Sequence, residues 1–127
     1  MDRENRYQSK IERFTEEEEF ISAHVIENDV TERALLYSLQ VAIEISMDLI
    51  AMKVRDMGLK VEDDATNIEK ITDKNIISKG EGDFLRQMNG VRNFIVHRYN
   101  HLDMGFINEA LSRIDKLKNI IIKVADY

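Results

Sequence analysis

The sequence predicts an all-α protein, built as an antiparallel bundle of four to five helices. Three observations predict this class: the chain has no proline, it is rich in Glu, Lys and Ile, and its apolar residues recur at helical spacing. With 127 residues, 43% of them hydrophobic, the chain is long enough to bury a sizeable core. We therefore expect residues 1–127 to form a single helical domain.

The first helix is expected from about Asp2 to about Val25, with a narrow apolar stripe facing the core. The stripe consists of Tyr7, Ile11, Phe14, Ile21 and Val25. The segment "ENDVTER" follows and offers Asp29 and Thr31 as N-cap residues for the next helix.

The second helix, roughly Glu32 to Met57, has the clearest helical periodicity and ends at Gly58, a residue typical of helix C-termini. Apolar residues on more than one of its sides predict a central helix, or one shared with a partner subunit. In the next segment, Thr66 and Glu69 form a candidate capping box before a short helix, and "KNIISKGEG" is expected to be a connection.

The fourth helix is expected from about Gly82 to Tyr99, and the last helix from an Asp103 cap nearly to Tyr127. The core side of the fourth helix should carry Phe84, Leu85, Met88, Val91 and Ile95. The stripe of the last helix should be Ile107, Ala110, Leu111, Ile114, Leu117, Ile121 and Val124.

Composition excludes several classes of site. The chain has no cysteine, so disulfides, thiolate metal sites and cysteine nucleophiles are excluded together. The N-terminus lacks the apolar run of a signal peptide, and no later stretch is expected to reach the length of a membrane span. We expect a soluble, cytoplasmic protein that uses no metal and no cofactor.

The net charge of −6 argues against broad electrostatic binding to nucleic acid, so any such contact should be local. Residues 12–32 contain eight acids and one arginine, whereas residues 79–101 carry a net charge of +2. The run "EEEE" at residues 16–19 spreads over every face of a helix and is most simply a solvated run. It could also help to meet a basic partner.

The stretch "RNFIVHRYN" places Arg92, Asn93, His97 and Tyr99 near the end of the fourth helix. At about 100° per residue, Asn93 and His97 share one line, roughly opposite the centre of the apolar arc. Arg92 and Tyr99 share another line at the margin of that arc, if the helix persists that far. The spacing predicts that these polar side chains converge on a groove beside the core.

The string "VRNFIVHRY" resembles the R-x4-H-x-Y signature of the HepT toxins, a branch of the HEPN helical-bundle superfamily, with Arg92, His97 and Tyr99 in the three positions. "LLYSLQVAIEISMDLI" and "HLDMGFINEAL" resemble other parts of that family, whereas "EDDATNIEKITDKN" lacks the proline that is frequent there. The resemblance implies a metal-independent endoribonuclease toxin that acts as a homodimer. It also implies a minimal nucleotidyltransferase as antitoxin, which transfers AMP to Tyr99.

The residues themselves suit this chemistry. His97 is suited to proton transfer, and Arg92 can hold a phosphate through two donors. One motif supplies one histidine, so two motifs facing each other across a two-fold dimer would supply a base, an acid and paired arginines. Asn93 and Tyr99 would support the site, and a modified Tyr99 would repel RNA by its charge.

Each residue also has a purely structural interpretation. His97 would then be a cation at a helix C-terminus, and Tyr99 an amphipathic residue that closes the edge of the core. His24 is expected to be structural, and His101 a loop residue. The rival function is a non-catalytic helical module that binds nucleotide or the nucleotidyltransferase without cutting RNA.

Overall fold

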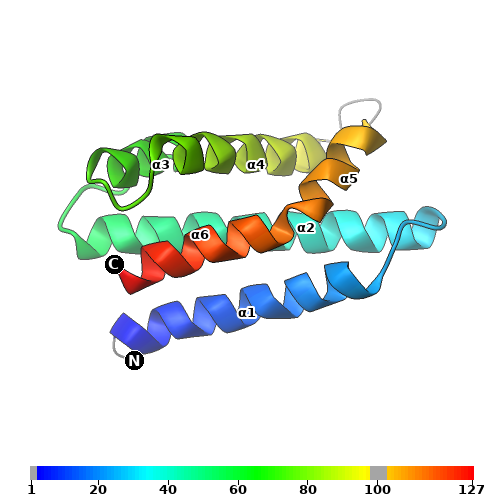
Figure 1. The fold of residues 1–127 in the computed structure, drawn as a ribbon, viewed down its shortest axis with the longest axis horizontal. Helices are drawn as coiled ribbons and strands as arrows, with labels where there is room; N and C mark the ends of the chain where they lie inside the picture. Colours follow the sequence, from blue (N-terminus) through cyan, green and yellow to red (C-terminus); the bar gives the residue numbers. More distant parts are fainter. Residues whose placement is uncertain (1–2, 98–102) are drawn as a thin grey trace.

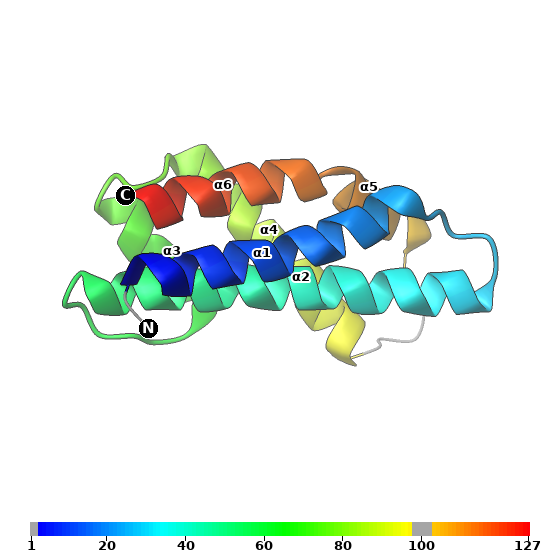
Figure 2. The ribbon, with the colours of Figure 1, turned by 90° about the horizontal axis from the view of Figure 1, so that it is seen from below.

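The computed structural model describes residues 3–97 and 103–127, and within those ranges the chain forms six α-helices and no β-strand. The helices are α1 (Arg3–Ala23), α2 (Asp29–Asp56), α3 (Asp64–Asp73), α4 (Lys79–His97), α5 (Met104–Ser112) and α6 (Ile114–Asp126). In Figure 1 the long helix α2 lies between α1 and the pair formed by α3 and α4, and it packs against α1, α3, α4 and α6. Figure 2 shows the bundle from below, where α2 runs nearly its whole length. The predicted all-α bundle is confirmed.

The caps expected for α2 and α3 are wrong. Asn28, not Asp29 or Thr31, is the N-cap of α2; its side chain accepts from the backbone N–H of Val30 and Thr31. Thr31 instead completes the capping box, because its hydroxyl accepts from the backbone N–H of Asn28. Helix α2 therefore begins three residues earlier than expected.

Asp63 caps α3 through the backbone N–H of Thr66, so the expected capping box of Thr66 and Glu69 is wrong. The expected Asp103 cap of the next helix is confirmed, since its carboxylate accepts from two backbone N–H groups of α5. Gly58 follows α2 with a φ of +76°, the left-handed conformation that ends helices most readily at glycine.

The expected last helix is broken into α5 and α6 at Arg113, which has φ −106° and ψ 14°. Figure 1 shows α5 turning away from the line of α6 at this point. The break lets Ile107 and Ala110 of α5 and Ile114 and Leu117 of α6 all reach the core although the two helices point in different directions. The described residues therefore hold one helix more than the largest number expected.

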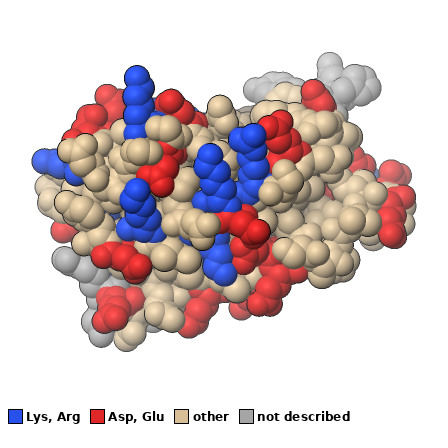
Figure 3. Space-filling view, viewed as in Figure 1, with Lys and Arg blue, Asp and Glu red and all other residues tan. Residues whose placement is uncertain are grey.

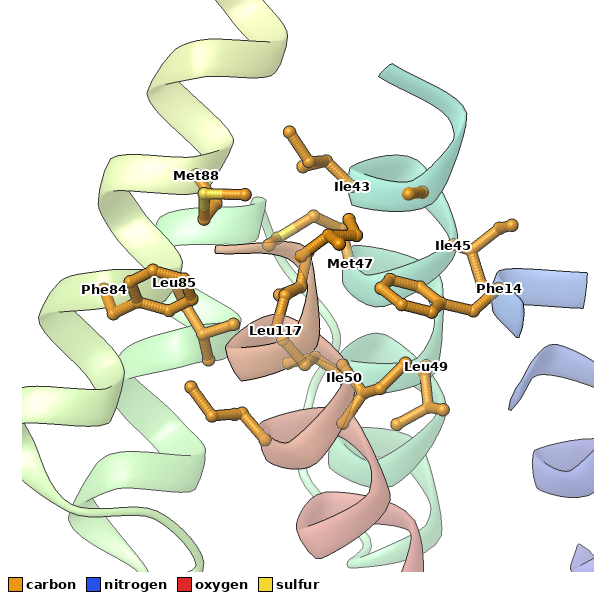
Figure 4. Packing of buried hydrophobic residues seen from close by; sticks show 14 of the residues in the cluster. Phe14, Ile43, Ile45, Met47, Leu49, Ile50, Phe84, Leu85, Met88 and Leu117 are labelled. Atoms are coloured by element: carbon orange, nitrogen blue, oxygen red, sulfur yellow. The ribbon is translucent and has the colours of Figure 1, made fainter. Parts of the chain in front are cut away.

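The core lies between α2 and the helices around it. Figure 4 shows Phe14 of α1, Ile43 and Ile50 of α2, Leu85 of α4 and Leu117 of α6 directed toward the same interior. All five of these side chains are buried. Val25, which was expected to extend the core stripe of the first helix, lies beyond α1 and is 66% exposed, so that expectation is wrong.

The expectation that no segment reaches the length of a membrane span also needs correction. Helix α2 is long and apolar enough to pass a test of length and composition, with a mean hydropathy of 1.5 over its best window. Of that window, 56% is buried inside the bundle. The apolar surface of α2 therefore serves the protein core, as its several apolar sides predicted.

Polar contacts fix α1 antiparallel to α2. The Tyr7 hydroxyl donates to Asp56 Oδ2 at 2.7 Å near one end, and the Ser38 hydroxyl donates to Glu17 Oε1 at 2.7 Å further along. The residue number rises on α1 as it falls on α2, which is the pattern of antiparallel neighbours. Both described ends of the chain lie at the same end of the bundle in Figure 1.

Much of the acidic run at residues 16–19 is used within the chain. Arg13 pairs with Glu16 and Glu17, and Lys118 of α6 pairs with Glu18 at 3.0 Å. Figure 3 shows acidic and basic side chains interspersed on the face that it presents, without a broad field of one sign. That face accordingly offers no extended basic surface for nucleic acid.

Candidate active site

Helix α4 carries the motif, and a capping box sets where this helix begins. The Ser78 hydroxyl accepts from the Glu81 backbone N–H at 3.1 Å, while the Glu81 carboxylate accepts from the Ser78 backbone N–H at 2.8 Å. Glu81 also accepts from Lys123 of α6 at 2.8 Å, and this hydrogen bond lowers the pKa of the Glu81 carboxyl. The start of α4 is thereby fixed to α6, three residues earlier than the sequence predicted.

The buried face of α4 is the one that helical spacing predicts. Its five buried large side chains are Phe84, Leu85, Met88, Val91 and Ile95. Asn93 and His97, which share a line away from that face, are both exposed. The motif therefore lies at the border between the core and the protein surface, on a helix whose other side is anchored.

Arg92 reaches across from α4 to α2, where it contacts Glu44, a residue that was not among the predicted site residues. Its Nε donates to Glu44 Oε2 at 3.1 Å, and its Nη2 donates to the same oxygen at 2.9 Å. Nη1 donates to Asn93 Oδ1 at 3.0 Å. The side chains of Arg92 and Glu44 are 31% and 36% exposed, so the pair is held at the surface, not sealed inside.

A second carboxylate, on α3, lies close enough to interact with the charge of Arg92. Asp64 occupies the first turn of α3, and burial raises the pKa of its carboxyl, an effect that the nearby positive charge of Arg92 partly offsets. The charge of Asp48, one turn beyond Glu44 on α2, acts on Asp64 in the same direction as burial. Arg92 thus lies where three helices meet, with acidic groups contributed by two of them.

Asn89 lies one turn before Asn93 on α4. Its Oδ1 is the one buried side-chain oxygen or nitrogen for which the described part of the chain provides no hydrogen-bond partner. A buried acceptor without a donor is costly, and such atoms are uncommon in folded proteins. This unsatisfied acceptor and the motif therefore lie on the same stretch of α4.

The structure brings some of the predicted residues together and leaves others apart. Arg92 and Asn93 are in direct contact, whereas His97 stands five positions further on, about 7.5 Å along the helix axis. His97 is the last residue of α4 and is exposed. Tyr99, the fourth predicted site residue, and His101 lie outside the described residues. His24 is exposed; its Nδ1 is hydrogen-bonded to the Phe20 carbonyl at 2.8 Å and its ring stacks on Phe20.

Glu44 is the residue that sequence reasoning missed. A signal was present, because Glu44 and Asp48 are the only charged residues in the apolar segment "LLYSLQVAIEISMDLI". Residues four apart share one face of a helix, so these two acids mark a single polar line on an otherwise apolar element. Within the ranges that the structure describes, no group of three or more His, Cys, Asp or Glu side chains is arranged to hold a metal ion.

Comparison with known proteins gives a consistent picture. A family model described as "Ribonuclease HepT-like" matches residues 5–124. A relative from Archaeoglobus fulgidus named "Putative RNase" is 42% identical over 122 residues, which cover 96% of this chain and 92% of the relative. A second protein of that name and organism is 36% identical and covers 95% of this chain and 89% of its own length.

A third relative, from Methanocaldococcus jannaschii, carries the same description and is 47% identical over 74 residues, covering 58% of this chain and 85% of the relative. No solved structure matches the chain.

Proposed function

Because the chain belongs to the HepT-like ribonuclease family, we propose that it is a metal-independent endoribonuclease, the toxin of a toxin–antitoxin pair. The observation that carries the proposal is the placement of Arg92 and His97 on one rigid helix, at the edge of the core and accessible to a polymer. His97 is exposed, as a group that exchanges protons with RNA must be.

The proposed reaction is an internal attack of the RNA 2′-hydroxyl on the adjacent phosphorus. A base removes the 2′-hydroxyl proton, the bond to the 5′-oxygen breaks, and an acid protonates that leaving oxygen. His97 serves in proton transfer because the unperturbed pKa of histidine lies near neutrality. Arg92 stabilises the charge that develops on the phosphate oxygens.

One chain supplies one His97, so the proposed active unit is a homodimer in which two motifs face each other. The two histidines would then act as base and acid.

The proposed control is adenylylation of Tyr99 by a minimal nucleotidyltransferase that acts as antitoxin. This part rests on the family resemblance of "RNFIVHRYN", because Tyr99 lies outside the described residues. The added phosphate would repel RNA by its charge, and the bulk of the added nucleoside would obstruct RNA binding at the motif. Mass spectrometry of Tyr99 after incubation with such a transferase and ATP should show the mass of one added AMP.

Replacement of His97 by alanine tests the nuclease itself. The variant should lose RNA cleavage by about 100-fold or more, the typical contribution of one general acid or base. It should remain a dimer in light scattering. His24→Ala is the matched control, because His24 is likewise an exposed histidine at the C-terminal end of a helix.

Cleavage that survives in His97→Ala would refute the catalytic role. It would favour the rival function, a helical module that binds the nucleotidyltransferase or a nucleotide without cutting RNA. Full activity in a strictly monomeric preparation would refute the shared site.

A further inference from the structure

We infer that Glu44 is a positioning residue of the ribonuclease site, which holds the Arg92 guanidinium in the orientation that grips the scissile phosphate. The inference rests on the proposed function, since it assigns Glu44 a part in RNA cleavage. It starts from the contact between two helices, in which both Nε and Nη2 of Arg92 donate to Glu44 Oε2 at 3.1 and 2.9 Å.

Some N–H groups of the Arg92 guanidinium donate hydrogen bonds within the protein, and the others are left to bind a phosphate. A guanidinium carries five N–H groups. Two of them, on Nε and Nη2, are directed to Glu44, and one on Nη1 is directed to Asn93 Oδ1. One N–H then remains on each terminal nitrogen. Two such donors are what a guanidinium needs to bind a phosphate in bidentate fashion.

Glu44 can hold this orientation because its own position is fixed by the core. Its sequence neighbours Ile43 and Ile45 are 0% and 6% exposed on the central helix α2. On the other side of the contact, Val91 precedes Arg92 and is 2% exposed. The ion pair thus connects two helices whose backbones are held by the core. It fixes the orientation of the Arg92 side chain, which would otherwise be flexible.

The pair is also weak enough to admit a substrate. At 31% and 36% exposure, the two side chains remain partly solvated, and ion pairs of this kind contribute little net stability. Only Oε2 of Glu44 accepts from Arg92, so the contact occupies one edge of the guanidinium and does not enclose it. An incoming phosphate can therefore bind at the remaining donors while Glu44 keeps its contact.

The opposite role for Glu44 would be that of a latch, a carboxylate that competes with RNA for Arg92. The two roles predict opposite kinetics. Removing a positioning group lowers kcat, because the guanidinium is misplaced in the transition state. Removing a competing carboxylate lowers KM and leaves kcat equal or higher.

The experiment measures kcat and KM of Glu44→Ala and Glu44→Gln on fluorescently labelled single-stranded RNA oligonucleotides that the wild-type protein cleaves. We expect kcat of Glu44→Ala to fall by about 10-fold to 100-fold, as misplacement of a catalytic group typically costs, with KM changed far less. Glu44→Gln should retain more activity than Glu44→Ala, because its amide oxygen still accepts a hydrogen bond. Both variants should fold, since the side chain is half-exposed.

Asp48→Asn is the matched control. It removes a carboxylate one turn away on the same helix, and Asp48 pairs with Lys10 at 3.3 Å instead of with Arg92. Its kcat should stay within about two-fold of wild type, as expected for an exposed ion pair outside the site.

A second readout is the NMR signal of the Arg92 Nε–H group, assigned by comparison with Arg92→Lys. The signal should be present in wild type and Asp48→Asn and broadened in Glu44→Ala. Unchanged kcat in both Glu44 variants, or a lower KM with equal or higher kcat, would overturn the positioning role. Wild-type protein that cleaves none of the RNAs would overturn the proposed function first, and the role of Glu44 with it.

Discussion

Two glycines of α4, Gly82 and Gly90, should respond in opposite ways to replacement by alanine. A Cβ added at Gly82 would lie 2.7 Å from the Thr72 hydroxyl oxygen of α3, closer than such atoms approach in folded proteins. Thr72 cannot move away freely, because it is β-branched and its hydroxyl donates to the Ile68 carbonyl at 2.8 Å. A Cβ added at Gly90 meets no atom within 4 Å.

The expected magnitudes follow from these contacts. Alanine in place of glycine within a helix gains about 0.8–1 kcal/mol from propensity. At Gly82 the overlap with Thr72 costs about 1–3 kcal/mol, so the net result is a loss of up to about 2 kcal/mol. At about 2.1 cal/mol/K of unfolding entropy per residue, each kcal/mol shifts the melting temperature of this chain by about 4 °C.

Thermal and urea unfolding, followed by circular dichroism, measure both effects. Gly90→Ala should raise the melting temperature by up to about 4 °C, and Gly82→Ala should lower it by up to about 8 °C. In a Thr72→Ala background the close contact is gone, so Gly82→Ala should become stabilising. If Gly82→Ala stabilises the protein as much as Gly90→Ala does with Thr72 intact, the close approach of α3 to α4 is refuted.

Three further changes have expected outcomes. Asn28→Ala should lower stability by about 1 kcal/mol in thermal unfolding through loss of the α2 cap, whereas Asp29→Ala should not. Arg92→Ala should abolish RNA cleavage but change stability by less than about 1 kcal/mol, because its ion pair with Glu44 is half-exposed. Asp64 has a raised folded pKa, so its native state binds the proton more tightly than the unfolded chain. The stability of the wild type relative to Asp64→Asn should therefore fall as the pH rises. The fall should begin near the ordinary pKa of aspartate, about 3.9, and end above the raised pKa of the folded state. Urea unfolding of both proteins across this pH range measures the difference. A difference that grows in the opposite direction would show that Asp64 is not desolvated in the fold.

The sequence predicted those parts of the fold that depend on local periodicity. The buried face of α4 was predicted residue by residue, because apolar spacing and burial are linked along any single helix. Helix starts were harder to predict, because Asn28, Asp29 and Thr31 are all suitable N-caps and the choice depends on the backbone path into the helix. Gly80 and Gly82 concealed the Ser78 capping box, since glycines ordinarily indicate a connection.

The break between α5 and α6 illustrates a different limit. Apolar residues keep helical spacing through Arg113, so periodicity alone predicts one continuous helix. The direction in which each half must point is set by the surfaces that α2 and α4 offer, and those surfaces exist only after the bundle has formed. Apolar periodicity carries no information about the direction of a helix axis, so it does not predict the change of direction at Arg113.

The candidate site likewise has a part that the sequence predicts and a part that depends on the packed fold. Arg92 and His97 could be selected because their spacing is local, a matter of one helix. The contact of Arg92 with Glu44 spans 48 positions and depends on how α2 and α4 pack against each other, which the buried side chains between these helices determine. Core residues such as Met88 therefore influence the geometry of the site, because a shift of α4 against α2 changes where the Arg92 guanidinium points. If the site works as proposed, its geometry is a property of the packed bundle as much as of the motif.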